Sequence, residues 1–121
     1  MKALIILAHG SRRKESNEEV KNLTIHIETL IQKEFEIVGH AFLEAAKPSL
    51  ANSIENMVSN NASEITIFPY FLNSGVHIKD DIPNIVKKAR IKYPKCKFKL
   101  SSPIGAYKKM PEIILKQLKS E

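Results

Sequence analysis

The chain has 121 residues, of which 43% are hydrophobic and 26% charged, a balance typical of one folded domain and unlike that of a disordered chain. Its apolar runs are all shorter than the ~20 residues of a membrane-spanning helix. A signal peptide is not expected, because the first apolar run covers residues 3–8 only and polar and basic residues follow it. Cys96 is the single cysteine, which excludes an intrachain disulfide and favours a reducing, cytoplasmic location.

The net charge of +6 is unevenly distributed along the chain. Residues 1–86 hold 8 basic and 11 acidic residues, whereas residues 87–121 hold 11 basic and 2 acidic residues. Such a basic segment could bind a nucleic acid, an acidic membrane surface or a carboxylate-rich small molecule, or it could simply be a solvated surface. Its few aromatic residues are not spaced as stacking platforms, which weakens the case for a protein that binds single-stranded nucleic acid. We expect neither a nucleic-acid nor a membrane partner.

The first third of the chain predicts a strand, a helix and a second strand. Residues 3–8 form a continuous apolar run, typical of a strand buried on both faces. Ser16 and Glu19 have capping-box spacing, which predicts the start of a helix there. The residues that follow recur at helical intervals: Val20, Leu23, Ile27, Leu30 and Ile31. Residues 37–43 are again apolar and predict the second strand.

The middle of the chain repeats this alternation. Pro48 suits the first turn of a second helix, which Asn60 and Asn61 end. Residues 64–72, rich in Ile, Phe and Tyr, predict the third strand, and a loop over residues 73–77 follows. The acidic pair at 80–81 predicts the cap of a third helix, with Pro83 tolerated in its first turn.

The last part predicts a fourth strand at residues 97–101, a turn at 103–105 and a final helix with an apolar stripe of Ile113, Ile114 and Leu118. The overall pattern is therefore βαβαβαβα. Strands separated by helices indicate a parallel sheet flanked by helices, joined by right-handed crossovers. We expect one domain over residues 1–121 with a four-stranded, flavodoxin-like α/β fold in the strand order 2-1-3-4.

Three polar residues follow three of these strands. His9 ends the first strand, Glu44 ends the second, and His77 lies in the loop after the third. Ligands of open parallel sheets bind at the carboxyl ends of the strands, where these side chains would converge. Two imidazoles and a carboxylate suit a divalent metal such as Fe, Co, Ni or Zn, and also suit proton abstraction. Each residue taken alone could instead be structural, and Glu44 could simply pair with Lys47.

The other histidines and the cysteine are interpreted as structural. His26 lies beside the apolar stripe of the first helix, and Cys96 precedes the fourth strand in basic surroundings. His40 has the same strand parity as Phe42 and Glu44, so it could face the same side of the sheet as they do. It is interpreted as a packing residue.

Four segments together resemble a known family. They read Leu-Ala-His-Gly-Ser-Arg at 7–12, Ala-Phe-Leu-Glu at 41–44, Phe-Leu-Asn-Ser-Gly-Val-His-Ile-Lys-Asp-Asp-Ile-Pro at 71–83 and Ser-Pro-Ile-Gly at 102–105. In this order and spacing they resemble the sirohydrochlorin chelatases of the CbiX/SirB type in their short, single-module form. The third segment is the most specific of the four.

This resemblance implies a lyase that inserts a divalent metal, cobalt first and otherwise iron or nickel, into the anionic tetrapyrrole sirohydrochlorin on the way to cobalamin or siroheme. It implies no organic cofactor, the metal being a co-substrate. His9 would accept a proton and bind the metal, and His77 would be the second metal ligand. The substrate-binding residues would be Glu44, Phe71, Leu72, Asn73, Ser74, Gly75 and Val76.

The length also agrees with the short form of this family, because longer members resemble two fused modules. We therefore expect a homodimer with two sheets facing each other across the substrate. The alternative function is a non-catalytic tetrapyrrole or metal carrier, or a polyanion-binding module that uses residues 87–119. The sequence does not decide which metal is used or how many sites a dimer has.

Overall fold

The computed structural model describes residues 1–31, 33–73 and 75–121, with the backbone alone for residues 76–78. Its centre is a four-stranded sheet in which every described strand pair is parallel. The strands are β1 (Lys2–Ala8), β2 (Ile37–Phe42), β3 (Glu64–Pro69) and β4 (Lys97–Leu100). Their order is β2-β1-β3-β4, which confirms the predicted fold class and strand order.

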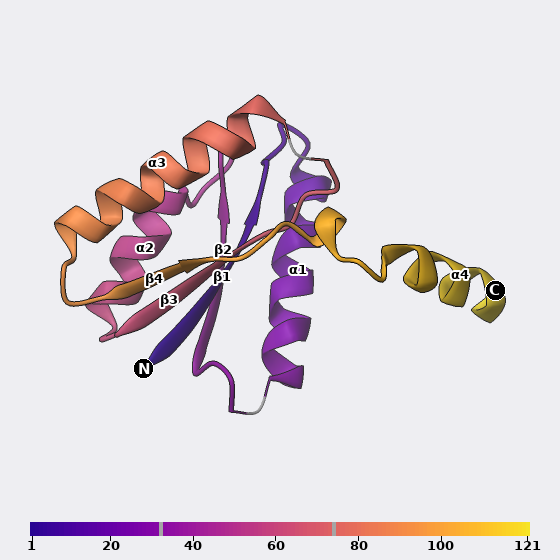
Figure 1. Cartoon of the computed structure of the whole chain (residues 1–121), viewed down its shortest axis with the longest axis horizontal. Helices are drawn as coiled ribbons and strands as arrows, with labels where there is room; N and C mark the ends of the chain where they lie inside the picture. The colour runs from indigo at the N-terminus through magenta and orange to yellow at the C-terminus, as the bar shows by residue number, and fades with distance from the viewer. Residues whose placement is uncertain (32, 74) are drawn as a thin grey trace.

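Helices flank the sheet on both faces (Figure 1). They are α1 (Lys14–Leu30), α2 (Leu50–Ser59), α3 (Val76–Lys92) and α4 (Met110–Ser120), with a short 3-10 helix, η1 (Ile104–Ala106), before α4. The α2 and α3 helices cover one face, and α1 covers β2 and part of β1 on the other. The fourth helix extends away from this body (Figure 1).

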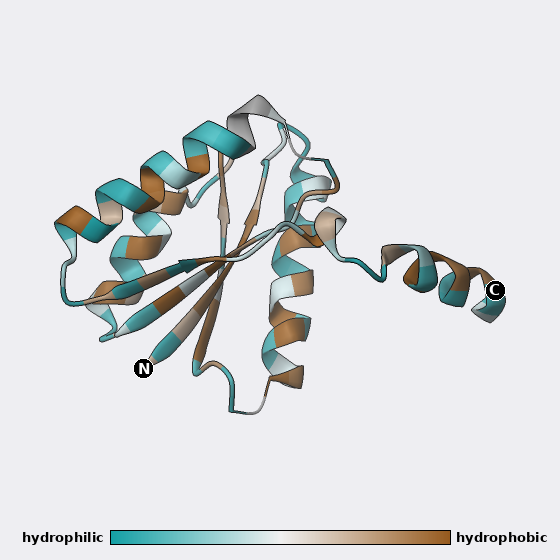
Figure 2. Ribbon diagram, viewed as in Figure 1, coloured by the Kyte–Doolittle hydropathy of each residue, from teal (hydrophilic) through white to brown (hydrophobic). Residues whose placement is uncertain are grey.

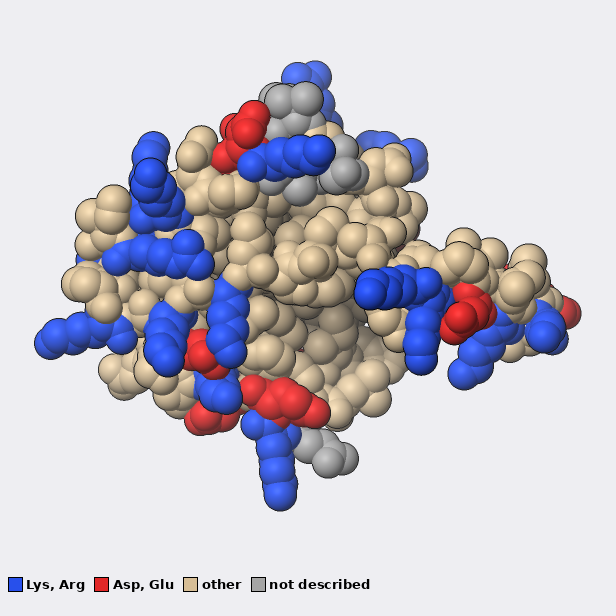
Figure 3. All heavy atoms as spheres, viewed as in Figure 1, with Lys and Arg blue, Asp and Glu red and all other residues tan. Residues whose placement is uncertain are grey.

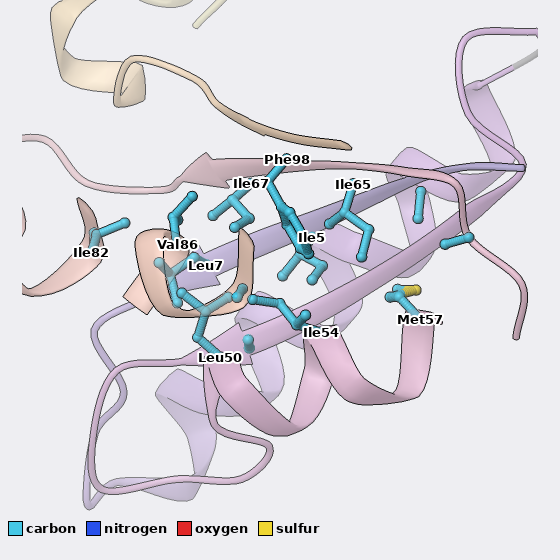
Figure 4. Packing of buried hydrophobic residues seen from close by; sticks show 14 of the residues in the cluster. Ile5, Leu7, Leu50, Ile54, Met57, Ile65, Ile67, Ile82, Val86 and Phe98 are labelled. Carbon is cyan, nitrogen blue, oxygen red and sulfur yellow. The ribbon is translucent and has the colours of Figure 1, made fainter. Parts of the chain in front are cut away.

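The main core lies between the sheet and the α2 and α3 helices (Figure 4). Ile5 and Leu7 of β1 point into it and pack with Ile54 of α2 and Val86 of α3. Residues 3–8 of β1 are buried on both faces, as the continuous apolar run predicts. The carboxyl end of this central strand is thereby held in a fixed position, and the candidate site lies there.

Two helices begin earlier than predicted. The α1 helix begins at Lys14 and its N-cap is Arg13, so the cap predicted at Ser16 is wrong. The α3 helix begins at Val76 after the extended residue Gly75, so the cap predicted at residues 80–81 is also wrong. Consequently His77 lies in the first turn of a helix and not in a loop, and Pro83 is inside α3 at an exposed position. An exposed proline costs the helix one backbone hydrogen bond but no core packing.

Other helix and strand ends differ from the prediction by a few residues. Pro48 precedes α2, whose N-cap is Ser49 with its side-chain oxygen accepting the Asn52 backbone N–H at 3.1 Å. The third strand ends at Pro69 and not at residue 72, because proline cannot donate to the ladder. Asn60 and Asn61 end α2 as predicted, and Asn61 adopts a φ of 69°. In the described residues, no helix is long and apolar enough to cross a membrane.

Candidate functional site

The carboxyl ends of β1 and β2 bring His9 and Glu44 together. His9 is the first residue beyond β1, and its carbonyl accepts the Glu44 backbone N–H at 3.0 Å. Gly10 makes this approach possible, because its φ is 92° and a Cβ there would collide with the Glu44 carbonyl oxygen. Both His9 and Glu44 are exposed, so their side chains are available to a ligand.

The segment after β3 supports the His9 ring. Phe71 is almost fully buried at 4% exposure, and its ring meets the His9 imidazole edge-on with 4.5 Å between centroids. Leu72, in contrast, is 71% exposed, and Tyr70 is 44% exposed. Phe71 therefore orients the imidazole, while its two neighbours leave apolar surface at the same edge of the sheet.

Two hollows flank His9, one on each side. The first has a volume of about 440 Å³ and lies toward α1, with Tyr70, Phe71, Leu72 and Asn73 along one wall and Ser11, Asn17 and Val20 along the other. The second, of about 350 Å³, lies toward α3 and is lined by Leu43, Glu44, Asp81, Asn84, Ile85 and Lys88. Because His9 borders both, its imidazole can meet one ligand on each side.

Asn17 fixes the loop that borders the first hollow. Its side-chain oxygen accepts the Ser11 backbone N–H at 2.9 Å, and its amide nitrogen donates to the Ser11 carbonyl at 2.7 Å. The sequence alone predicts a helix cap in this segment and gives no signal for a role of Asn17. The paired amide bonds make it a positioning residue for the first hollow.

The second hollow contains further polar residues that the sequence alone does not single out. Asp81, Asn84 and Lys88 are spaced so that they lie on one face of α3, the face that borders Glu44. Helical spacing alone groups these three residues, but it does not show that their face of α3 borders Glu44. Lys88 is also the residue of the basic segment that lines a hollow together with His9.

Part of the predicted site lies outside the described residues. Ser74 is one such residue, and so are the side chains of Val76 and His77, although the backbone of both belongs to the first turn of α3. Asn73 is exposed, and Gly75 is the N-cap of α3. Within the described residues, no group of three or more His, Cys, Asp or Glu side chains is placed to hold a metal ion.

His40 and Cys96 stand apart from this edge. The His40 ring packs edge-on against Phe42, 5.5 Å between centroids, on the α1 face of the sheet. Burial, and then the nearby charge of Lys21, lowers the pKa of His40, while Glu18 opposes this shift. Burial, and then the charge of Glu64, raises the pKa of the Cys96 thiol, which disfavours the reactive thiolate. These positions agree with the structural interpretation of both residues.

A family model described as CbiX matches residues 3–121. The chain belongs to the CbiX family. Among its curated relatives, the sirohydrochlorin cobaltochelatase of Saccharolobus solfataricus is 27% identical over 98% of this chain and 94% of that protein. The sirohydrochlorin cobaltochelatase of Sulfolobus acidocaldarius is 30% identical over 94% of this chain and 87% of that protein.

Solved structures of this family share the fold. A CbiX protein from Marinobacter aquaeolei superposes with a TM-score of 0.83 at 24% identity and covers 99% of this chain and 96% of its own. The sirohydrochlorin chelatase SirB of Bacillus subtilis subspecies spizizenii, in complex with cobalt, gives a TM-score of 0.85 at 24% identity. This second match covers 98% of our chain and 50% of SirB, so the present chain corresponds to half of that protein.

Proposed function

We propose that this CbiX-family chain is a sirohydrochlorin chelatase, a lyase that inserts a divalent metal ion into a carboxylate-rich tetrapyrrole. The observation that carries the proposal is the position of His9, exposed between two hollows and next to Glu44 at the carboxyl edge of the sheet. Cobalt is the first candidate metal, because the curated relatives are cobaltochelatases, and iron and nickel are the alternatives.

In this proposal, His9 accepts a proton from the macrocycle. Metal insertion removes two pyrrole N–H protons as one divalent cation enters, so the total charge of the macrocycle is unchanged. His9 would accept one of these protons, and the other would pass to water, to which this edge of the sheet is exposed. A neutral imidazole can accept such a proton near neutral pH. Glu44, whose backbone N–H bonds to the His9 carbonyl, lines the same hollow as His9 and would contact the substrate there. The incoming cation itself helps deprotonation, since it lowers the pKa of the groups that it meets.

The metal ion is a substrate in this scheme, held briefly by His9 and His77. Imidazole nitrogen is a suitable ligand for cobalt, iron and nickel alike, so these ligands alone do not select one metal. The start of α3 at Val76 puts the His77 backbone at the same edge of the sheet as His9. This ligand pair follows from the family motif and remains a prediction.

The macrocycle would occupy the first hollow. The exposed Leu72 and Tyr70 and the buried Phe71 offer an apolar wall to a flat ring system. Residues 71–76 and Glu44 are the predicted substrate contacts. On the other side of His9, Lys88 and Asn84 offer a cation and hydrogen-bond donors for the carboxylates of the substrate.

A homodimer would complete the site. The chain covers half of SirB, so a second copy would occupy the place of the other half. Closed two-fold pairing is also the commonest assembly of identical chains. The substrate would then lie between the carboxyl edges of two sheets.

The decisive experiment follows the absorbance of sirohydrochlorin under anaerobic conditions, with purified protein and Co²⁺, Fe²⁺ or Ni²⁺ in turn. We expect at least one metal to be inserted faster than without protein. If no metal is inserted faster, the proposal is wrong. Stoichiometric binding without turnover would identify a carrier instead, and binding of polyanions that weakens steeply with salt would identify an electrostatic binding module.

Substitution of His9 tests the site. We expect His9→Ala to lower the insertion rate by about 10²-fold or more, because proton transfer by a positioned side chain contributes that much. His26→Ala is the matched control, since His26 is an exposed histidine on α1. Circular dichroism of both variants checks the fold. Full activity of His9→Ala would contradict the assignment.

A further inference from the structure

A third hollow lies between the α2 and α3 helices. It has a volume of about 270 Å³ and is lined by Ala51, Ile54, Ile85, Lys88, Ala89, Lys92 and Tyr93. We call it the α2–α3 groove. Its floor is apolar, because Ile54 and Ala89 are 1% and 7% exposed and belong to the main core. The charged residues of its lining are Lys88 and Lys92, both exposed, so the groove joins an apolar floor to two cations.

The α2–α3 groove is adjacent to the second hollow of the candidate site. Ile85 and Lys88 line both of them, and the second hollow also contains His9 and Glu44. Figure 2 shows hydrophilic residues alternating with hydrophobic ones along α3, so one helix supplies both kinds of lining. A large ligand that meets His9 can therefore extend past Lys88 into the groove.

The two lysines form a pair of neighbouring cations. They are four residues apart on α3, where such residues lie side by side and like charges repel. The sequence has no acidic residue between Asp81 and Glu112 to offset them. Within the described residues, neither lysine forms an ion pair, whether with Glu55 of α2 or with another carboxylate. Their charges are thus left for an external anion.

Other cations on this side of the molecule are engaged within the chain. Lysine and arginine side chains gather over α3 and β4 (Figure 3). Of these, Arg90 donates from Nη2 to the Phe98 carbonyl at 3.0 Å. Lys92 instead lies 5.5 Å from the centroid of the Tyr93 ring, a cation–π contact that holds its ammonium group at the rim of the α2–α3 groove.

We propose that Lys88 and Lys92 together bind two neighbouring carboxylates at one edge of the substrate macrocycle, while the α2–α3 groove covers the apolar carbon atoms between them. This inference rests on the proposed function and extends the substrate site beyond His9, Glu44 and residues 70–76. An apolar hollow with a few placed polar groups suits a ligand that is apolar and anionic at once. The bound carboxylates would also relieve the repulsion between the two lysines.

This role has a kinetic signature of its own. The carboxylates of the macrocycle keep the same charge before, during and after metal insertion. Contacts to them therefore stabilise the bound substrate and the transition state equally, which lowers KM and leaves kcat nearly unchanged. His9, in contrast, acts on a proton that moves in the reaction, so its loss lowers kcat.

The variants Lys88→Met and Lys92→Met test the pair, because methionine keeps an apolar stem and removes the charge. Metal insertion into sirohydrochlorin is followed anaerobically at varied substrate concentration. We expect each variant to raise KM about 5-fold, as the loss of an exposed ion pair would, with kcat nearly unchanged. Lys87→Met is the matched control, since Lys87 is the adjacent lysine of α3 and lines neither hollow. An unchanged KM in both variants, or a lower kcat at unchanged KM, would overturn the proposal.

Binding without metal separates this proposal from chelation. The dissociation constant of metal-free sirohydrochlorin is compared with that of its esterified form, whose carboxylates are neutral. We expect the wild-type chain to prefer the acid form and the double variant Lys88→Met, Lys92→Met to lose most of this preference. If the wild-type chain inserts no metal, the proposed function is wrong, whereas a lysine-dependent preference would still support the pair. An equal preference in both proteins would overturn the pair even where metal is inserted.

Urea denaturation of the free proteins distinguishes binding from folding. Removal of one of two repelling lysines should leave the free energy of unfolding unchanged or slightly higher. A variant with a raised KM and a clearly lower stability would indicate that the lysine supports the fold, which would contradict the proposal.

Discussion

The two faces of the sheet differ in how completely they are packed. The face under α2 and α3 holds a continuous cluster of fifteen buried residues, whereas the buried cluster under α1 consists of Ala8, Val20 and Phe42. The face under α2 and α3 therefore supplies most of the hydrophobic stabilisation. The α1 face leaves room for the first hollow and for a hollow of about 530 Å³ beside Phe68. The fold thus separates the surface that holds the domain together from the surface that carries the candidate site.

The largest effect is expected from a substitution in the core under the α2 and α3 helices. Ile54→Ala removes a side chain that is 1% exposed, so we expect a loss of about 2–5 kcal/mol in the free energy of unfolding. Ile25→Ala is the matched change on α1, where the side chain is 50% exposed, and it should change stability by less than about 0.5 kcal/mol. Urea denaturation measures both. Equal losses would contradict the difference between the faces.

A smaller effect is expected at the junction of β1 and the site. Gly10→Ala would push a Cβ into the Glu44 carbonyl at a φ of 92°, so we expect a loss of about 1–3 kcal/mol together with a distorted site. Gly75→Ala is the control for stability, because no atom of the described residues lies within 4 Å of a Cβ there. Denaturation curves of the two variants test this contrast. A Gly10→Ala variant as stable as Gly75→Ala would show that the backbone around Glu44 can accommodate a side chain at residue 10.

The sequence predicts the sheet well and the helix starts poorly, for physical reasons. A buried parallel strand must be continuously apolar, as residues 3–8 are, and topology rules then leave few strand orders. Helix starts rest on weaker local signals. The predicted cap at Ser16 fails because its neighbour Asn17 bonds to the Ser11 loop instead, and Gly75 gives no side-chain signal at all.

The candidate site, too, is predictable from the sequence only in part. His9 and Glu44 could be placed together because both follow strands that are neighbours in the sheet. The sequence does not single out Asn17 and Lys88, because helical spacing does not show which strand end their side of the helix borders. The apolar residues of α4 have the spacing of a core-facing helix, yet Ile113, Ile114 and Leu118 are 43%, 54% and 61% exposed. Periodicity indicates an apolar face, but it does not indicate whether the rest of the chain covers that face.

The smallest expected effect concerns His40 on the α1 face. Burial and the charge of Lys21 lower its pKa in the folded state below the ordinary value of 6.5. The unfolded chain therefore binds a proton more readily, so the contribution of His40 to stability is complete above pH 6.5 and is lost as the pH falls through the lower folded pKa.

We expect His40→Gln to lose less stability than the wild-type chain on acidification over that range, because the variant has no imidazole to protonate next to Phe42. Urea denaturation of each protein at about pH 7.5 and about pH 5 gives its loss of unfolding free energy between the two pH values, and these losses are compared between variant and wild type. His26→Gln controls for removing an imidazole from the exposed side of α1. Equal acid sensitivity of His40→Gln and the wild-type chain would show that solvent reaches His40 freely. The α1 face would then be more open at β2 than its half-buried residues indicate.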